Sequence, residues 1–326
     1  ETGACEAPPP DLANSLLVLN KADLGQDWGV EDSAPGTSDR QFVSAMTSEG
    51  LERLIAAMVN RLIPHPPKPG EAVPFTSQLA DAILAATYEK LPEFFGILPK
   101  AGLQVRRVEP FREQDGGAAH YARGTTDGSR PGTFYAHLSD MRAASKHRLE
   151  NLAYHEGVPG HHMQISIQQE LEGLPAFRAN KGYTAFSEGW GLYAEGLGKE
   201  MGGYEDPYAD FGRLSGEIWR AVRLVVDTGI HAKRWTQDEA VQYALENSPR
   251  PEPSVRSEIR RYFNNPGQAT AYKIGMLRIQ AIRAKAEAAL GDNFDIRDFH
   301  DQVLGSGQLP MSMLEAKIDA WIEATR

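Results

Sequence analysis

Residues 151–164 read Asn-Leu-Ala-Tyr-His-Glu-Gly-Val-Pro-Gly-His-His-Met-Gln. Three of the chain's nine histidines lie within eight positions of this stretch, and a glutamate follows the first of them. Zinc in proteins prefers His nitrogen and carboxylate oxygen, and a catalytic zinc keeps three protein ligands and one open position. The stretch therefore predicts a zinc site on a helix, with His155 as one ligand. Glu156 would accept a proton from the attacking water.

The second ligand is either His161 or His162. The usual helical spacing, His-Glu-x-x-His, places two histidines one turn apart, whereas these lie six and seven positions after His155. A helix turns about 100° per residue, so His162 returns to the face of His155 in an unbroken helix. Pro159 and Gly160 argue against an unbroken helix, because proline removes a backbone donor and clashes with the preceding turn. We expect one of the two histidines to bind zinc and the other to turn away.

A third ligand is expected downstream, in the stretch Thr-Ala-Phe-Ser-Glu-Gly-Trp-Gly-Leu-Tyr-Ala-Glu over residues 184–195. Glu188 follows His161 by 27 positions, which leaves room for one helix to end and a second to return antiparallel. Glu195 lies seven residues further, on nearly the same helix face, where it could orient a ligand histidine. Aromatic neighbours such as Trp190 indicate a buried helix, in which an unpaired carboxylate would be costly. The alternative is that both glutamates are solvated.

Outward from this centre, apolar periodicity predicts a mainly α protein. Thr236 and Glu239 form a capping box at one helix start, and Gly291 is suited to end a helix. A small β element is expected near residues 103–138, with strands over 103–111 and 132–138. The second strand would be either an edge that binds substrate backbone or part of a core hairpin. Helices are expected over 44–63, 77–90, 141–158, 161–172, 184–200, 208–232, 237–246, 253–263, 267–290, 295–304 and 311–324.

Residues 1–40 are rich in Gly, Pro, Asp and Ser, and they predict a flexible N-terminal arm. No later linker divides the chain, so residues 41–326 are expected to form one helical domain. Cys5, followed by a Pro-rich tract, resembles the mature start of a bacterial lipoprotein. This resemblance implies a lipid anchor and an exported or periplasmic location; the alternative is a stray cysteine in a flexible tail.

The composition excludes several classes of function. A net charge of −10 and a pI near 5.5 argue against nucleic acid or an anionic membrane as the main partner. No apolar run of about 18 residues is present, so no membrane span is predicted. Cys5 is the only cysteine, which excludes a disulfide framework and a multi-cysteine zinc site. Any metal must therefore be held by His and carboxylate.

Several motifs together resemble one bacterial family, known as domain of unknown function 885. Its pattern is matched by His-Glu-Gly-Val-Pro-Gly-His-His-Met-Gln at 155–164 and Phe-Ser-Glu-Gly-Trp-Gly-Leu-Tyr-Ala-Glu at 186–195. Further matches are Arg-Leu-Val-Val-Asp-Thr-Gly-Ile-His at 223–231 and Pro-Gly-Gln-Ala-Thr-Ala-Tyr-Lys-Ile-Gly at 266–275. The resemblance covers roughly residues 85–326. It extends more distantly to helical gluzincin peptidases, and it implies a gluzincin-like helical peptidase fold with a groove and one zinc.

The resemblance also bears on the remaining site residues. His161 follows Gly160, as in the Gly-His step of related peptidases, and we therefore favour it over His162 as the ligand. His231 and Tyr272 lie in matched motifs and could donate to the oxyanion of the tetrahedral intermediate; the alternative for each is a core residue with a satisfied polar end. Arg223 could bind a substrate carboxylate or form a structural ion pair, and Arg278 offers the same two readings.

Family members usually carry a long helical half before the zinc motif, and only about 150 residues precede it here. We therefore expect that half to be missing or to come from another chain, as in a homo-oligomer. The sequence predicts a zinc metallopeptidase that acts on a peptide substrate. Two alternatives stay open: a non-catalytic binding or scaffold protein that keeps the fold, and a metal hydrolase of non-peptide amides or esters.

Overall fold

The computed structural model describes residues 17–20, 40–43, 77–113, 119–127, 129–138, 146–179 and 182–326. Cys5, most of the expected arm over 1–40 and the helix expected over 44–63 lie outside these residues. The chain divides into two compact units, Glu1–Glu71 and Ala72–Arg326. In the first unit, β1 (Leu17–Asn20) pairs in parallel with β2 (Arg40–Val43). The second unit contains the candidate site.

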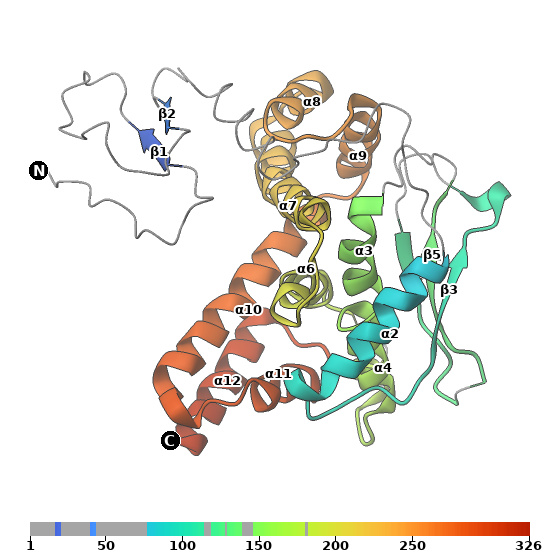
Figure 1. Cartoon of the computed structure of the whole chain (residues 1–326), viewed down its shortest axis with the longest axis vertical. Coiled ribbons are helices and arrows are strands. Elements are labelled where there is room, and N and C mark those ends of the chain that lie inside the picture. Colours follow the sequence, from blue (N-terminus) through green and yellow to red (C-terminus); the bar gives the residue numbers. More distant parts are fainter. Residues whose placement is uncertain are drawn as a thin grey trace, which may run out of the picture. The chain divides into compact units, whose positions relative to one another are not determined.

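The second unit is mainly helical, as predicted (Figure 1). The bounds of α6 and α8 coincide with the predicted ranges, and most others differ by only a few residues at each end. Thr236 and Glu239 form the predicted capping box at the start of α8, and Gly291, at a φ of 52°, ends α10. The helices are α2 (Ser77–Phe94), α3 (Leu149–Glu156), α4 (His161–Glu170), α5 (Ala176–Ala179), α6 (Thr184–Glu200), α7 (Pro207–Lys233), α8 (Gln237–Glu246), α9 (Glu252–Asn264), α10 (Gln268–Leu290), α11 (Ile296–Leu304) and α12 (Met311–Thr325).

The β element near residues 103–138 is a three-stranded sheet with the order β3-β5-β4. β3 (Leu103–Arg107) runs parallel to β5 (Gly132–Ala136), and β4 (Ala119–Ala122) runs antiparallel to it. β5 is therefore the central strand, so of the two alternatives left open for it, an edge that binds substrate backbone is wrong. A strand whose two sides are already paired has no free backbone groups for strand addition.

The helix expected over 141–158 is shorter than predicted. A 3-10 turn, η3 (Lys146–Arg148), leads into α3, which ends at Glu156. The cap residue Gly157 donates its N–H to the carbonyl of Ala153 at 2.9 Å, and the chain then leaves the helix. Residues 139–145 lie outside the described part of the chain. The metal-site histidines thus lie at a helix end and not along one helix.

The main core forms where α6 crosses α10. At their crossing, a β-carbon added to Gly189 would lie 2.5 Å from the Cα of Gly275, so only glycine permits this approach. Trp190, Phe186 and Ile279 are fully buried there. Dense packing of this kind leaves little room for movement. The core therefore holds α6, which carries Glu188 and Glu195, in a fixed position.

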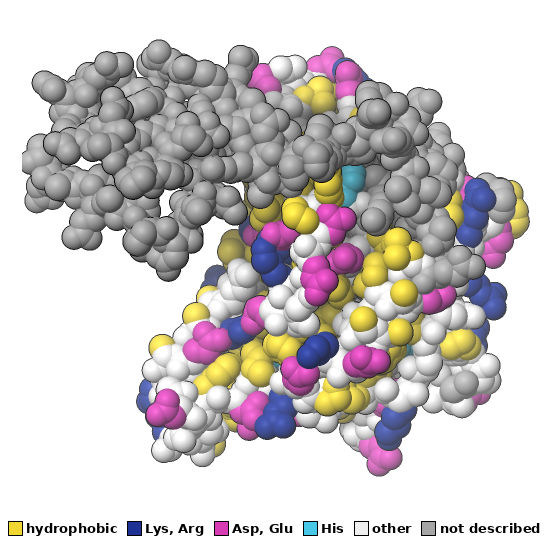
Figure 2. Space-filling view, viewed as in Figure 1, with side chains coloured by type: hydrophobic (Ala, Val, Ile, Leu, Met, Phe, Trp, Pro, Cys, Tyr) yellow, Lys and Arg dark blue, Asp and Glu magenta, His cyan; other side chains and the backbone are white. Residues whose placement is uncertain are grey.

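A second buried cluster joins α7, α8 and α9, and it includes Trp219, Val226, Val255 and Ile259. Figure 1 shows α8 and α9 beside one end of the long α7. In the same view, hydrophobic side chains gather along the band between α10 and α2, with acidic and basic side chains around it (Figure 2). Within the described residues, no helix is both long and apolar enough to cross a membrane.

Candidate metal centre

The site begins where α3 ends and α4 begins. Val158, Pro159 and Gly160 connect the two helices, and the Val158–Pro159 peptide bond is cis. A β-carbon on Gly160 would lie 2.1 Å from the carbonyl oxygen of His155, so this close turn requires glycine. Trp190 of α6 donates its indole N–H to the carbonyl of Pro159 at 2.8 Å. The chain therefore breaks between two helices here, at the Pro159 and Gly160 that argued against an unbroken helix, and α6 holds this break.

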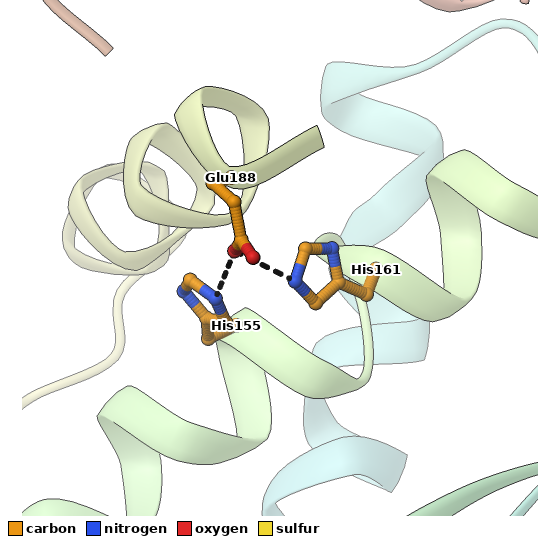
Figure 3. A group of neighbouring side chains, drawn as sticks. All are labelled: His155, His161 and Glu188. Atoms are coloured by element: carbon orange, nitrogen blue, oxygen red, sulfur yellow. Dashed lines mark ion pairs between the residues drawn. The ribbon is translucent and has the colours of Figure 1, made fainter. Parts of the chain in front are cut away.

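Three side chains with metal-ligating atoms meet at this break, two histidines and a glutamate (Figure 3). The Oε2 atom of Glu188 lies 3.5 Å from His155 Nε2 and 3.3 Å from His161 Nε2. The two imidazole rings lie 4.7 Å apart at an angle of 83°. Tetrahedral zinc with bonds of about 2.0–2.2 Å separates its ligand atoms by about 3.4 Å. The type and spacing of these side chains therefore fit zinc.

Glu195 lies behind His155. Its Oε1 atom accepts a hydrogen bond from His155 Nδ1 at 2.7 Å and another from the guanidinium of Arg220 at 3.0 Å. The side-chain amide of Asn151 donates to the other carboxylate oxygen of Glu195, and Glu195 is only 1% exposed. A carboxylate in this place fixes the ring orientation and tautomer of a ligand histidine. The arrangement leaves Nε2 of His155 directed toward Glu188.

Glu156 follows His155 at the last position of α3 and is 7% exposed. Its carboxylate has no hydrogen bond or ion pair with any other residue that the structure describes. Most buried carboxylates are paired, because an unpaired charge loses hydration without compensation. Glu156 is thus a carboxylate beside the cluster whose oxygens are not engaged with any described residue.

The electrostatics of the cluster are set by burial and by two glutamates. Burial lowers the pKa of His155, but hydrogen bonds to Glu188 and Glu195 outweigh it and raise the pKa to about 10. Burial raises the pKa of Glu188, but the two histidines hold it well below the ordinary value. Without a metal, His155 is therefore protonated at neutral pH. A metal must displace this proton in order to bind, so binding and protonation compete.

His162 does not lie in the cluster. It is fully buried; its Nε2 donates to the carbonyl of Ala101 at 3.1 Å, and its Nδ1 lies 3.0 Å from the hydroxyl of Tyr121. Burial lowers the pKa of His162 to about 4, so the ring is neutral. Adjacent helical residues point about 100° apart, and the restart of the helix at His161 decides which of them faces Glu188. Of the two adjacent histidines, the structure brings His161 to Glu188 and leaves His162 away from the cluster.

Tyr272 and His231, the two expected oxyanion donors, have different surroundings. The Tyr272 ring stacks on His155 with centroids 6.1 Å apart, and Gln268 Nε2 lies 3.3 Å from its hydroxyl. The same nitrogen is 3.5 Å from Oε1 of Glu188. His231 instead donates to the carbonyl of Tyr262 at 3.0 Å, near the end of α7. The structure brings Tyr272 to the cluster and leaves His231 away from it.

Three residues beside the site were not predicted from the sequence. Asn151 lies one turn before His155 on α3, and Gln268 lies one turn before Tyr272 on α10, so both share a face with a site residue. Helical spacing alone could have identified these two. Arg220 offers no comparable local signal, because its partner Glu195 lies 25 positions away on another helix.

Comparison with known proteins places the chain in a family. A family model described as "Bacterial protein of unknown function (DUF885)" matches residues 41–318. The crystal structure of a "putative lipoprotein" from Colwellia psychrerythraea is 39% identical, with a TM-score of 0.75, and the match covers 84% of this chain and 47% of that one. A second such structure, from Shewanella oneidensis, is 20% identical, has a TM-score of 0.64 and covers 82% and 53%. No curated protein matches significantly.

The chain therefore spans about half the length of these two solved structures, 47% and 53% respectively. The match to the Shewanella structure, at 20% identity, supports the fold alone. The match to the Colwellia structure, at 39% identity, and the family model over residues 41–318 support membership of the family as well. The family model includes every residue of the cluster, from His155 to Glu188, and Tyr272 as well. The protein belongs to the bacterial family of unknown function DUF885.

Proposed function

We propose that this protein is a zinc-dependent peptidase. The observation that carries the proposal is the convergence of His155, His161 and Glu188, whose ligand atoms all lie within 4.8 Å of one another. Two histidines and one carboxylate are a ligand set of catalytic zinc peptidases. The neighbouring Glu156, free of partners among the described residues, supplies the base that such a reaction needs.

Each residue then has a defined role. Zinc bound by the three ligands would lower the pKa of water and polarise the scissile carbonyl. Glu156 accepts the proton of the attacking water and passes it to the leaving amine. Tyr272 donates a hydrogen bond from its hydroxyl to the developing oxyanion, because Gln268 already donates to the oxygen of that hydroxyl. Glu195 holds the imidazole of His155 in place.

We further propose that the protein is exported and lipid-anchored at Cys5. The support is that, of the two solved relatives, the one from Colwellia psychrerythraea, which is 39% identical, bears the word lipoprotein in its name. Because the chain spans about half the length of these relatives, the groove around a peptide substrate would be completed elsewhere. Either the rest of a longer chain or a second copy, as in a homo-oligomer, would supply that part.

A library of fluorescence-quenched peptides, assayed with and without a chelator, tests the proposed activity. We expect cleavage that 1,10-phenanthroline abolishes and that added zinc restores. A parallel set of ester and non-peptide amide substrates gives the comparison. Turnover of esters alone would contradict a peptidase and favour a different metal hydrolase. Zinc binding without any turnover would favour a scaffold that keeps the fold.

A further inference from the structure

Four arginines lie near one another next to the candidate metal centre, and two of them contact Tyr272. Arg220 and Arg223 lie on α7, and their side chains are only 8% and 9% exposed. Arg148 ends the 3-10 turn before α3, and Arg250 lies in the loop between α8 and α9; both are partly exposed. We call these four residues the arginine cluster. Three separate elements of the fold thus bring guanidinium groups to one place.

Aromatic rings connect the arginine cluster to the metal centre. The Cζ atom of Arg223 lies 4.6 Å from the ring centroid of Tyr272 and 5.9 Å from that of Trp219. Arg250 lies 4.5 Å from the Trp219 ring, and Arg220 lies 5.8 Å from the Tyr272 ring. The Tyr272 ring also stacks on the ligand histidine His155, as described above. One aromatic ring therefore separates the arginines from the metal ligands.

The carboxylates near the arginine cluster do not balance its charge. Glu195 forms an ion pair with Arg220 at 3.0 Å. Glu258 forms one ion pair with Arg223 at 2.7 Å and a second with Arg261 at 3.1 Å. Among the residues that the structure describes, no carboxylate forms an ion pair with Arg250 or with Arg148. The cluster therefore carries more positive than negative charge in a partly desolvated place, which is unfavourable without a further anion.

Unused hydrogen-bond donors accompany this excess charge. Nε of Arg220 and Nη1 of Arg223 are buried and have no hydrogen-bond partner among the residues that the structure describes. Burial, together with Arg148, Arg223 and Arg220, lowers the pKa of Arg250 well below its ordinary value, although an arginine stays protonated at neutral pH. Burial and Arg220 likewise lower the pKa of Arg148 to about 10. Buried donors without partners mark a place where a ligand can bind.

We propose that the arginine cluster binds a carboxylate of the peptide substrate. This inference rests on the proposed peptidase function and specifies the substrate class of that site. An extended peptide advances about 3.5 Å per residue, so one or two residues would span the ring between the metal centre and the arginines. The free C-terminus of a peptide fits this distance, which makes the protein a carboxypeptidase or dipeptidyl-carboxypeptidase. The side chain of an aspartate or glutamate in the substrate is the alternative source of the carboxylate.

Binding of matched probes to the full chain tests the inference without requiring catalysis. The probes are N-acetyl-Ala-Ala, its C-terminal amide, and N-acetyl-Ala-Glu amide, which carries its carboxylate on a side chain. They are titrated calorimetrically into the chelator-treated protein. We expect the free acid to bind about tenfold or more tightly than the Ala-Ala amide. Binding of the Glu-containing amide as tight as that of the acid would assign the site to acidic side chains instead.

Variants locate the effect. Arg250→Gln should abolish the preference for the acid, and Arg250→Lys should keep part of it. The control is Arg278→Gln, which removes the same charge from an exposed arginine of α10 that is paired with Glu315 of α12, and it should keep the full preference. Arg250→Gln should also leave the melting temperature unchanged or raised, because it relieves repulsion between like charges. A purely structural arginine would lower the melting temperature when it is removed.

The two proposals fail in different ways. Equal binding of acid and amide to the unmodified protein would overturn the carboxylate subsite, whether or not the enzyme cleaves peptides. A loss in Arg250→Gln no larger than that in Arg278→Gln would overturn the assignment to the arginine cluster. Acid-selective binding in a protein that never cleaves a peptide would support the subsite and remove only the peptidase proposal.

Discussion

His161 and His162 are neighbours in the chain, but their side chains have unrelated tasks. His161→Ala removes a nitrogen that lies 3.3 Å from Glu188, so we expect the purified variant to lose its zinc. His162→Ala should keep zinc but lose about 1–3 kcal/mol of stability, because the buried groups of Ala101 and Tyr121 lose their partner. Elemental analysis after dialysis and thermal melts measure both effects. Equal zinc retention in the two variants would refute the ligand assignment.

Glu156 allows the mechanism to be separated from the metal site. Glu156→Gln should retain about one zinc per chain, because Glu156 is not a ligand, and should lose about 10²–10⁴ in kcat. An amide nitrogen carries no lone pair for the water proton and the amide oxygen is a weak base. The matched control is Glu172→Gln, an exposed residue in the turn after α4, which should keep full activity. Full activity in Glu156→Gln would mean that another group is the base.

The residues of the site differ in how far the sequence could identify them. His155, Glu156, Glu188 and Glu195 follow from residue type and helical phase. The choice between His161 and His162 does not, because the phase of an unbroken helix favours the second, whereas the resemblance to a Gly-His step and the restart of the helix at His161 favour the first. The surroundings of His231 could not be predicted, because the motif gives its position near the end of α7 but not which residue its side chain contacts. That residue, Tyr262, lies on another helix, and only the tertiary structure places it there.

At the scale of elements, α6 is the helix on which the site depends. A β-carbon on Gly191 would lie 2.7 Å from Cε1 of His155, whose ring is held by Glu195 and cannot easily move. We therefore expect Gly191→Ala to displace the imidazole, weaken zinc binding by about tenfold or more and destabilise the fold by about 1–3 kcal/mol. Competition with a chromogenic chelator measures the affinity, and urea melts measure the stability.

The control for this prediction lies five residues further along the same helix. A β-carbon on Gly196 would meet nothing within 4 Å, so Gly196→Ala should leave zinc affinity unchanged. It should raise stability by about 0.5–1 kcal/mol, because alanine loses less conformational freedom than glycine in a helix. If both alanine variants bound zinc like the unmodified protein, the close packing of α6 on His155 would not matter for the site.

The elements themselves were predicted to different degrees. Helices such as α6, α8 and α10 have local signals, namely apolar periodicity, a capping box and a terminal glycine, and their bounds follow from these signals. β4 has only four residues and gives no periodic signal. The central place of β5 depends on its pairing with β3, about 30 positions earlier, which no local pattern specifies.

At the scale of the whole molecule, overall and local charge have opposite signs. The chain carries a net charge of −10, but Arg220, Arg223 and Arg250 lie over aromatic rings beside its candidate metal centre. An acidic surface repels anionic polymers, whereas a local basic cluster attracts a single carboxylate. This contrast favours a small anionic group at the end of a peptide over an extended acidic partner, and a mean property of the sequence cannot show it.

Zinc binding should also change the stability of the whole molecule in a pH-dependent way. In the metal-free protein, the pKa of His155 is about 10, above the unfolded value near 6.5. This raised pKa contributes stability that is fully present below about pH 6.5 and is lost as the pH rises toward 10. The contribution of His155 should therefore make the metal-free protein melt at a higher temperature at pH 6 than at pH 9.

Zinc reverses that trend, because it must displace the proton of His155 in order to bind. Zinc at about 100 times its dissociation constant adds about 2.7 kcal/mol to the free energy of unfolding. In a folded unit of about 250 residues, this increase raises the melting temperature by roughly 5–10 °C. We expect this rise to be larger at pH 9 than at pH 6 at the same free zinc concentration. Differential scanning fluorimetry with buffered zinc measures it, and His161→Ala is the control that should show no rise. A rise that is equal at both pH values would show that zinc does not compete with the proton of His155.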